Sequence, residues 1–152
     1  MSAPGRRRQL VAGLALSGCL LAAGCSDDPH EAYCAEVEEH QAELSDVAAS
    51  EDAGALFDAL DDYDELRDAA PRDIADDWAD VVDPLHALED LLEAHDLDPA
   101  AYSADTPPTD LDDATREEIE AAARAVGSER TVAAMAEVEQ HSLDVCGTPL
   151  SR

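Results

Sequence analysis

The sequence predicts an all-α fold, a small antiparallel bundle of about four to five helices. Apolar residues recur three and four positions apart along most of the chain, which is the period of one helix face. No stretch shows the alternation of apolar and polar residues that indicates a half-buried strand. Because only 3% of the residues are aromatic, we expect a thin core of Leu, Val and Ala at helix contacts.

A short polar break at residues 50–54 separates the first two predicted helices. The first helix covers residues 29–49, and the second ends before Pro71, a residue that suits the first position of a further helix. The inward face of the first helix is expected to carry Cys34, Val37, Gln41, Leu44 and Ala48. The inward face of the second is expected to carry Leu56, Leu60, Tyr63 and Leu66, with Phe57 beside them.

The third predicted helix has the clearest apolar pattern. Its core positions are Ile74, Trp78, Val81, Leu85, Leu88 and Leu92. Pro84 lies inside this pattern, and a kink or a short break is expected there because proline lacks a backbone N–H and clashes with the preceding turn. Trp78 and Tyr63 both fall at core spacing, which favours a packing role over a ligand platform.

The last third of the chain predicts a linker and two more helices. Residues 96–109 are proline-rich and form the linker, with one short turn around residues 100–102. The fourth helix begins at a Thr109 or Asp110 cap or at a capping box from Thr115, and it packs through Leu111, Ile119, Ala122 and Val126. Gly127 ends it and Ser128 caps the fifth helix. The fifth helix packs through Val132, Met135, Val138 and Val145 and closes at Cys146-Gly147.

The amino terminus has the features of an export signal. Arg6–Arg8 are basic, and the uncharged apolar run of residues 10–23 is shorter than the roughly 20 residues of a membrane-spanning helix. The run ends in "LAAGC", which resembles the bacterial lipobox, so the thiol of Cys25 would receive diacylglycerol and the peptide would be cut just before it. "LSGC", ending at Cys19, fits the usual lipobox better, but cleavage there would leave the apolar residues 20–23 exposed. Cys25 is therefore preferred.

These features divide the chain into a cleaved signal peptide (1–24), a polar tether (25–29), a helical bundle (30–147) and a tail (148–152). This organisation resembles small exported lipoproteins of high-GC Gram-positive bacteria, many of which have no known function. The resemblance implies a lipid anchor on the extracytoplasmic face of the cell membrane and carries over no functional residue. A twin-arginine route stays open beside general secretion because Arg7-Arg8 loosely resembles that signal.

Cys34 and Cys146 are the two cysteines that remain outside the signal peptide and the anchor. An exported protein meets oxidising conditions, so an even pair predicts a disulfide. A metal site at these cysteines is the alternative, but the chain has no C-x-x-C motif and no histidine at ligand spacing from either. A disulfide would make the first and last helices neighbours in the bundle.

The chain is strongly acidic. It has 37 acidic and nine basic residues, all nine of them arginine, and a net charge of −28, which becomes −31 once Arg6–Arg8 leave with the signal peptide. Such a field repels nucleic acid and attracts cations or a basic protein partner. The lack of lysine fits a GC-rich genome, and the acidity fits a salt-loving organism equally well.

Two Glu/His pairs are weak candidates for a metal site. Glu36 and His40 are four residues apart on the first helix, and Glu137 and His141 are four residues apart on the last. A ferritin-type site needs Glu-x-x-His spacing, which neither pair has, so no metal is assigned and a solvated helix face is expected. Divalent cations would then bind weakly through charge.

Two further acidic groups are weaker still. His86 lies near Asp83 and Asp90 on an expected exposed face. The loop that begins at Asp96 lacks the glycine and the glutamate that a calcium-binding EF-hand requires.

No catalytic centre and no cofactor are predicted. The chain contains neither a G-x-S-x-G nucleophile motif nor a glycine-rich phosphate loop. The 128 residues left after cleavage are too few for the two-lobed cleft of a transporter's solute-binding lipoprotein. The sequence therefore predicts a non-enzymatic, lipid-anchored binding module, with a cation- or metal-binding lipoprotein as the alternative.

Overall fold

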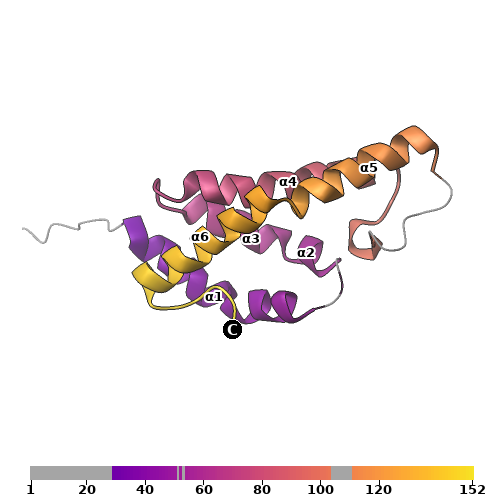
Figure 1. Cartoon of the computed structure of the whole chain (residues 1–152). Helices are drawn as coiled ribbons and strands as arrows, with labels where there is room; N and C mark the ends of the chain where they lie inside the picture. Colours follow the sequence, from indigo (N-terminus) through magenta and orange to yellow (C-terminus); the bar gives the residue numbers. More distant parts are fainter. Residues whose placement is uncertain (1–28, 51, 53, 104–110) are drawn as a thin grey trace, which may run out of the picture.

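The computed structural model describes residues 29–152 apart from 51, 53 and 104–110, and these residues form an all-α fold (Figure 1). Within that part of the chain no strand occurs, as the sequence predicts. The predicted signal peptide, Cys19 and Cys25 lie outside the described residues. The helices are α1 (Pro29–Ala49), α2 (Ala55–Asp58), α3 (Leu60–Ala69), α4 (Ala75–Ala94), the 3₁₀ turn η1 (Pro99–Ala101), α5 (Asp113–Val126) and α6 (Glu129–Cys146).

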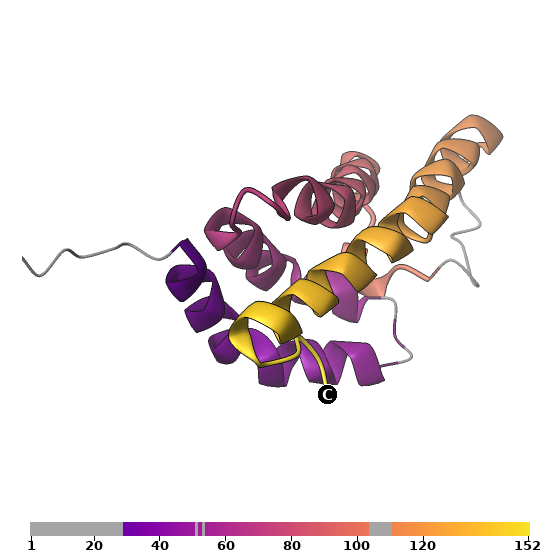
Figure 2. The ribbon, with the colours of Figure 1, turned by 60° about the vertical axis from the view of Figure 1, so that its left-hand side comes forward.

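Helices α5 and α6 follow one another along nearly one line, interrupted at Gly127 and Ser128 (Figures 1 and 2). Both contact α4, which runs in the opposite direction beside them. Helices α1 and α3 complete the bundle, because α3 contacts α1 and α4, and α1 contacts α6. The first and last helices are therefore neighbours, as predicted.

The core has two parts, and α4 contributes to both. The larger part lies between α1, α3, α4 and α6 and includes the fully buried Tyr33, Val37, Leu66 and Trp78. The smaller part joins the end of α4 to η1 and α5 through Leu88, Leu92, Tyr102 and Ile119. All six core positions predicted on the third helix are buried, which confirms the apolar pattern.

The carboxyl-terminal tail packs back on α1. Leu150 is buried in the larger core, the backbone N–H of Arg152 donates to Ser45 Oγ (3.0 Å), and the Gln41 side chain donates to the Pro149 carbonyl. Gly147 ends α6 with φ 67°, a left-handed conformation that favours glycine, and so turns the chain toward α1.

Two predictions about helix ends and breaks are wrong, and a third is narrowed. Helix α4 has no break at Pro84, because one lost backbone hydrogen bond is outweighed by core residues packed on both sides of it; the alternative of a kink stays a prediction. The predicted second helix is two helices that meet at Ala59. The N-cap of α5 is Asp112, whose carboxylate accepts the N–H groups of Ala114 and Thr115 (both 3.1 Å), the geometry of a true N-cap.

The inward faces of α1 and α6 also differ from those predicted. Helix α1 turns Tyr33 and His40 inward, while Ala48 is exposed. On α6, Val132 and Val145 are exposed, and the buried residues are Ala134, Val138 and Ser142. Val138 is buried as predicted, whereas Ala134 and Ser142 are small, so a count of large apolar residues does not find them.

Candidate functional site

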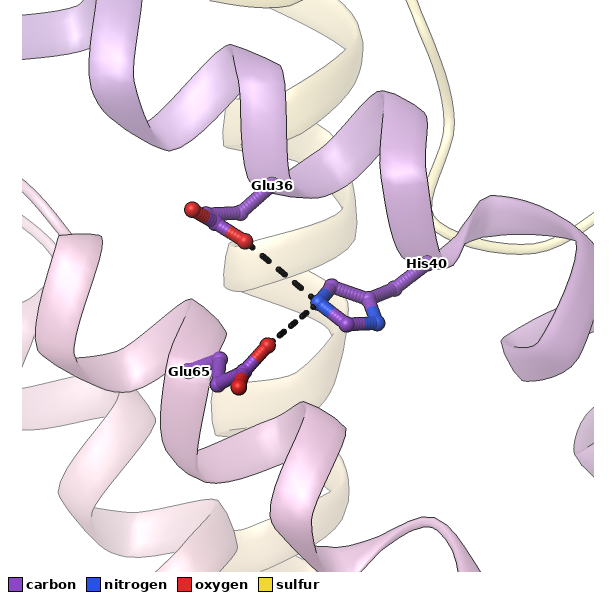
Figure 3. A group of neighbouring side chains, drawn as sticks. All are labelled: Glu36, His40 and Glu65. Atoms are coloured by element: carbon purple, nitrogen blue, oxygen red, sulfur yellow. Dashed lines mark ion pairs between the residues drawn. The ribbon is translucent and has the colours of Figure 1, made fainter.

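His40 lies at the centre of a cluster of carboxylates between α1 and α3 (Figure 3). Its ring projects from α1 toward α3 and is only 9% exposed. Glu36 stands one turn earlier on α1, and Glu65 and Asp62 come from α3. The cluster forms because α1 and α3 pack side by side and place His40 opposite the acidic face of α3.

The two ring nitrogens of His40 face different carboxylates. Nε2 lies 3.0 Å from Glu65 Oε2 and 3.4 Å from Glu36 Oε2, and Nδ1 lies 3.1 Å from Asp62 Oδ1. Nε2 is buried and makes no hydrogen bond of acceptable geometry. This nitrogen therefore lies close to two carboxylate oxygens but forms a hydrogen bond with neither of them.

The structure separates the two Glu/His pairs that the sequence offered. Glu36 and His40 join the cluster with Glu65, whereas Glu137 is exposed and is not part of it. His141 faces a different group: its Nδ1 lies 3.8 Å from Asp73 Oδ2, and its ring packs against those of His30 and Tyr33. The expectation that Glu36 and His40 belong to a solvated face is wrong for His40, which is buried.

His86 pairs with residues other than those predicted. Its Nε2 lies 2.9 Å from Asp64 Oδ2 on α3, and its Nδ1 lies 3.5 Å from Glu89 on its own helix. The hydrogen bond to Asp64 raises the pKa of His86 above its ordinary value of 6.5, and the charge of Glu89 adds to that effect. Asp64 also holds Arg67 at 2.7 Å, so these residues form a small charged network between α3 and α4.

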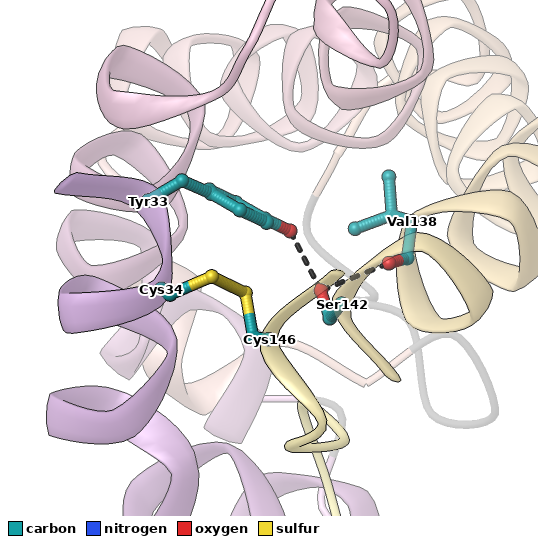
Figure 4. The surroundings of a disulfide bond; sticks show 5 residues. All are labelled: Tyr33, Cys34, Val138, Ser142 and Cys146. Carbon is teal, nitrogen blue, oxygen red and sulfur yellow. Dashed lines mark hydrogen bonds between the residues drawn. A yellow bond between two sulfur atoms is a disulfide. The ribbon is translucent and has the colours of Figure 1, made fainter. Parts of the chain in front are cut away.

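Cys34 on α1 and Cys146 at the end of α6 form a disulfide, as predicted (Figure 4). Beside it, Ser142 Oγ donates to the Val138 carbonyl (3.0 Å), so Tyr33 is the donor in its 2.7 Å bond with Ser142 Oγ. Burial raises the pKa of the Tyr33 hydroxyl. The disulfide and this hydrogen bond together connect α1 to α6.

An apolar groove is lined by residues of α2, α3, α4, α5 and α6. It has a volume of about 390 Å³ and is lined by Leu56, Tyr63, Val81, Leu85, Val126, Thr131, Val132, Met135, Ala136 and Glu139. A smaller hollow of about 210 Å³ shares Leu56, Tyr63, Met135 and Glu139 with it and continues toward Leu44 and Leu150. The α6 residues Val132, Met135, Ala136 and Glu139 have the spacing of one helix face.

One residue that lines the groove is acidic. Glu139, which is exposed, lines both hollows, as does Tyr63. Burial raises the pKa of the Tyr63 hydroxyl, and the charges of Asp62 and Glu139 raise it further. Val132, at 63% exposure, is the most exposed of the large apolar residues that the structure describes.

Sequence reasoning missed two kinds of functional residue. Glu65 and Asp62 complete the His40 cluster, and their only sequence signal is that they stand three residues apart on an acidic helix. Val132 is exposed beside the groove instead of facing the core, whereas Met135 packs against the larger core as predicted and also lines the groove.

No protein-family model, no curated protein and no solved structure matches this chain. Among the helices that the structure describes, none combines the length and the apolar character needed to cross a bilayer.

Proposed function

We propose that this protein is a membrane-anchored, extracytoplasmic lipoprotein that acts as a non-enzymatic binding module for a basic protein partner. The apolar groove carries the proposal. In a chain with a net charge of −28, a groove with apolar walls and an exposed Val132 is an unusual surface. Apolar patches rimmed by polar residues are typical of binding surfaces.

The occupant that fits best is an amphipathic helix with basic flanks. The groove is elongated, since two hollows share four lining residues, and an amphipathic helix inserts apolar side chains at regular spacing into such a groove. Glu139 lines the groove. The chain expected after cleavage has a net charge of −31, so the surface around the groove is strongly negative. Basic residues on the partner would therefore be attracted, whereas nucleic acid would be repelled.

The lipid anchor and the binding role fit together. The lipobox-like ending at Cys25 supports attachment of acyl chains there, and residues 26–28 would separate the lipid from α1. Anchoring confines the module to the membrane surface, where it meets other proteins of that face. Both cysteines of the described residues are joined in the disulfide.

A photo-crosslinking amino acid at position 132 tests the groove in intact cells of the host. We expect a covalent adduct with one protein from position 132 and none from position 137, because Glu137 is exposed on α6 outside the groove. The captured protein is then purified, and its affinity for the full-length lipoprotein is measured at several salt concentrations. Affinity should fall as salt rises, since charge attraction contributes to it.

Matched substitutions on α6 show whether the partner binds in the groove or elsewhere on the surface. Val132→Asp should weaken binding of the captured protein at least about tenfold, whereas Leu143→Asp should not. Leu143 is 48% exposed on the same helix and does not line the groove. Equal labelling from positions 132 and 137, or equal effects of the two aspartates, would refute a groove-binding partner.

A further inference from the structure

We propose that Glu36, His40 and Glu65 bind one zinc ion between α1 and α3. The three side chains each offer one ligand atom, and these atoms all lie within 4.8 Å of one another (Figure 3). The site is separate from the groove, because none of the three residues lines it. The inference therefore does not depend on the proposed partner.

One separation between ligand atoms matches that around a tetrahedral ion, and a second is slightly shorter. Zinc binds imidazole nitrogen and carboxylate oxygen at about 2.0–2.2 Å, so two ligand atoms at a tetrahedral angle are about 3.3–3.5 Å apart. Nε2 of His40 lies 3.4 Å from Glu36 Oε2 and 3.0 Å from Glu65 Oε2. Small side-chain adjustments would admit the ion, and Glu65, which is 63% exposed, has the freedom to make them.

Asp62 orients His40 for metal binding. Its Oδ1 lies 3.1 Å from Nδ1 of His40, which favours a proton on Nδ1. The lone pair of the neutral ring then lies on Nε2 and points between Glu36 and Glu65. A carboxylate behind the far nitrogen of a histidine is the usual support of a zinc ligand, since it fixes the tautomer and the ring orientation.

The surroundings of the buried Nε2 favour a cation beside it. Two carboxylate oxygens face a nitrogen that makes no hydrogen bond of acceptable geometry. In the tautomer with its proton on Nδ1, these three groups present only lone pairs to one another, and a metal ion between them would replace that repulsion by coordination. Zinc would bind all three groups at once and would also link α1 to α3.

The donor set distinguishes zinc from the cations that any acidic surface attracts. Calcium and magnesium prefer oxygen ligands, whereas zinc binds an imidazole nitrogen together with carboxylates. Three protein ligands leave a fourth position for water. Calcium and magnesium should therefore bind weakly across the acidic surface, with no requirement for His40.

Calorimetric titration of the full-length, detergent-solubilised and chelator-treated protein with Zn²⁺ tests the proposal. We expect one saturable site per chain that persists in excess Mg²⁺. Glu65→Gln should weaken zinc binding at least about tenfold, and Asp62→Asn should weaken it less. Glu39→Gln is the matched control, because Glu39 is an exposed glutamate of α1 outside the cluster. This substitution removes one negative charge from the protein, as Glu65→Gln does.

The fold of each variant is measured separately from its affinity for zinc. Each variant is first checked by circular dichroism, and Glu65→Gln is the decisive one because an exposed side chain tolerates substitution. His40→Gln then tests the nitrogen ligand in a chain shown to be folded. Zinc uptake that disappears in excess Mg²⁺, or equal weakening by Glu65→Gln and Glu39→Gln, would overturn the site.

Discussion

Cys34 and Cys146 are 112 residues apart in the sequence, and their Cα atoms lie 5.2 Å apart in the folded chain. The disulfide joins the first turns of α1 to the last turn of α6 and thus encloses almost the whole bundle. Tyr33, next to Cys34, adds a buried hydrogen bond to Ser142, one turn before Cys146 (Figure 4). Together these contacts fix the two ends of the bundle side by side, whereas the core between them contains few aromatic rings.

Reduction of the disulfide is expected to lower the melting temperature substantially. Closing a loop of this length stabilises the folded state by about 4–5 kcal/mol in the chain-entropy model, and a typical domain is stable by only about 5–15 kcal/mol. Thermal unfolding with and without reductant, followed by circular dichroism, measures the loss. We expect a smaller loss at high salt, because ions screen the repulsion within a strongly acidic chain.

Cys34→Ser/Cys146→Ser is the matched variant for this experiment. It should melt like the reduced wild type and should not respond to reductant. A wild type whose melting temperature is unchanged by complete reduction would contradict the prediction, as would free thiols in exported material detected by mass spectrometry.

Gly54→Ala is expected to destabilise the protein by about 1–3 kcal/mol. A Cβ built on Gly54 would lie 1.9 Å from the carbonyl oxygen of Ala100, so the backbone of η1 and the start of α2 would have to separate. Gly127→Ala is the control, since the nearest atom to its Cβ would be 4.0 Å away and its φ of −87° suits any residue. Urea denaturation of both variants measures the difference, and equal stabilities would show that the two segments separate without cost.

The sequence predicts the helices well because the period of a helix is a local property. The predicted bounds of the first helix, residues 29–49, are those of α1, and all six core positions of α4 are buried. The inward face of α6 could not be predicted in the same way. Val132 and Val145 are exposed, and the small residues Ala134 and Ser142 are buried beside Val138 instead.

The candidate metal site was predictable only in part. The spacing of Glu36 and His40 places them on one face of a single helix, which is local information. Glu65 and Asp62 reach His40 only because α3 packs against α1 in one particular register, and no pattern within either helix determines that register. The groove was missed for a similar reason, since it depends on where α6 lies relative to α4.

Cys25→Ser is expected to prevent lipid attachment and to release or misprocess the protein. The thiol is the acceptor of the diacylglycerol in the lipobox reading, and a serine hydroxyl does not replace it. Labelling cells with radioactive palmitate and separating membranes from the medium measures both effects. Cys19→Ser is the control and should leave labelling and membrane retention intact. Retention that survives Cys25→Ser and fails with Cys19→Ser would move the anchor to Cys19.

His86 is expected to make stability depend on pH. Its pKa in the folded chain is raised above 6.5, chiefly by the hydrogen bond to Asp64, so the folded state binds the proton more tightly than the unfolded chain. The resulting stabilisation is fully present below the unfolded value near 6.5 and is lost as the pH rises through the raised pKa of the folded state. His86→Gln should therefore reduce the free energy of unfolding more at about pH 5.5 than at about pH 8.5.

Two further measurements check the origin of this pH dependence. The ring of His86, followed by NMR, should titrate above 6.5 in the wild type and at a lower pH in Asp64→Asn, because that variant removes the charged acceptor of the hydrogen bond. His95→Gln, at the exposed end of α4, is the control substitution for urea denaturation at both pH values. If His86→Gln and His95→Gln change the free energy of unfolding equally at both pH values, the pairing of His86 with Asp64 does not contribute to the pH dependence.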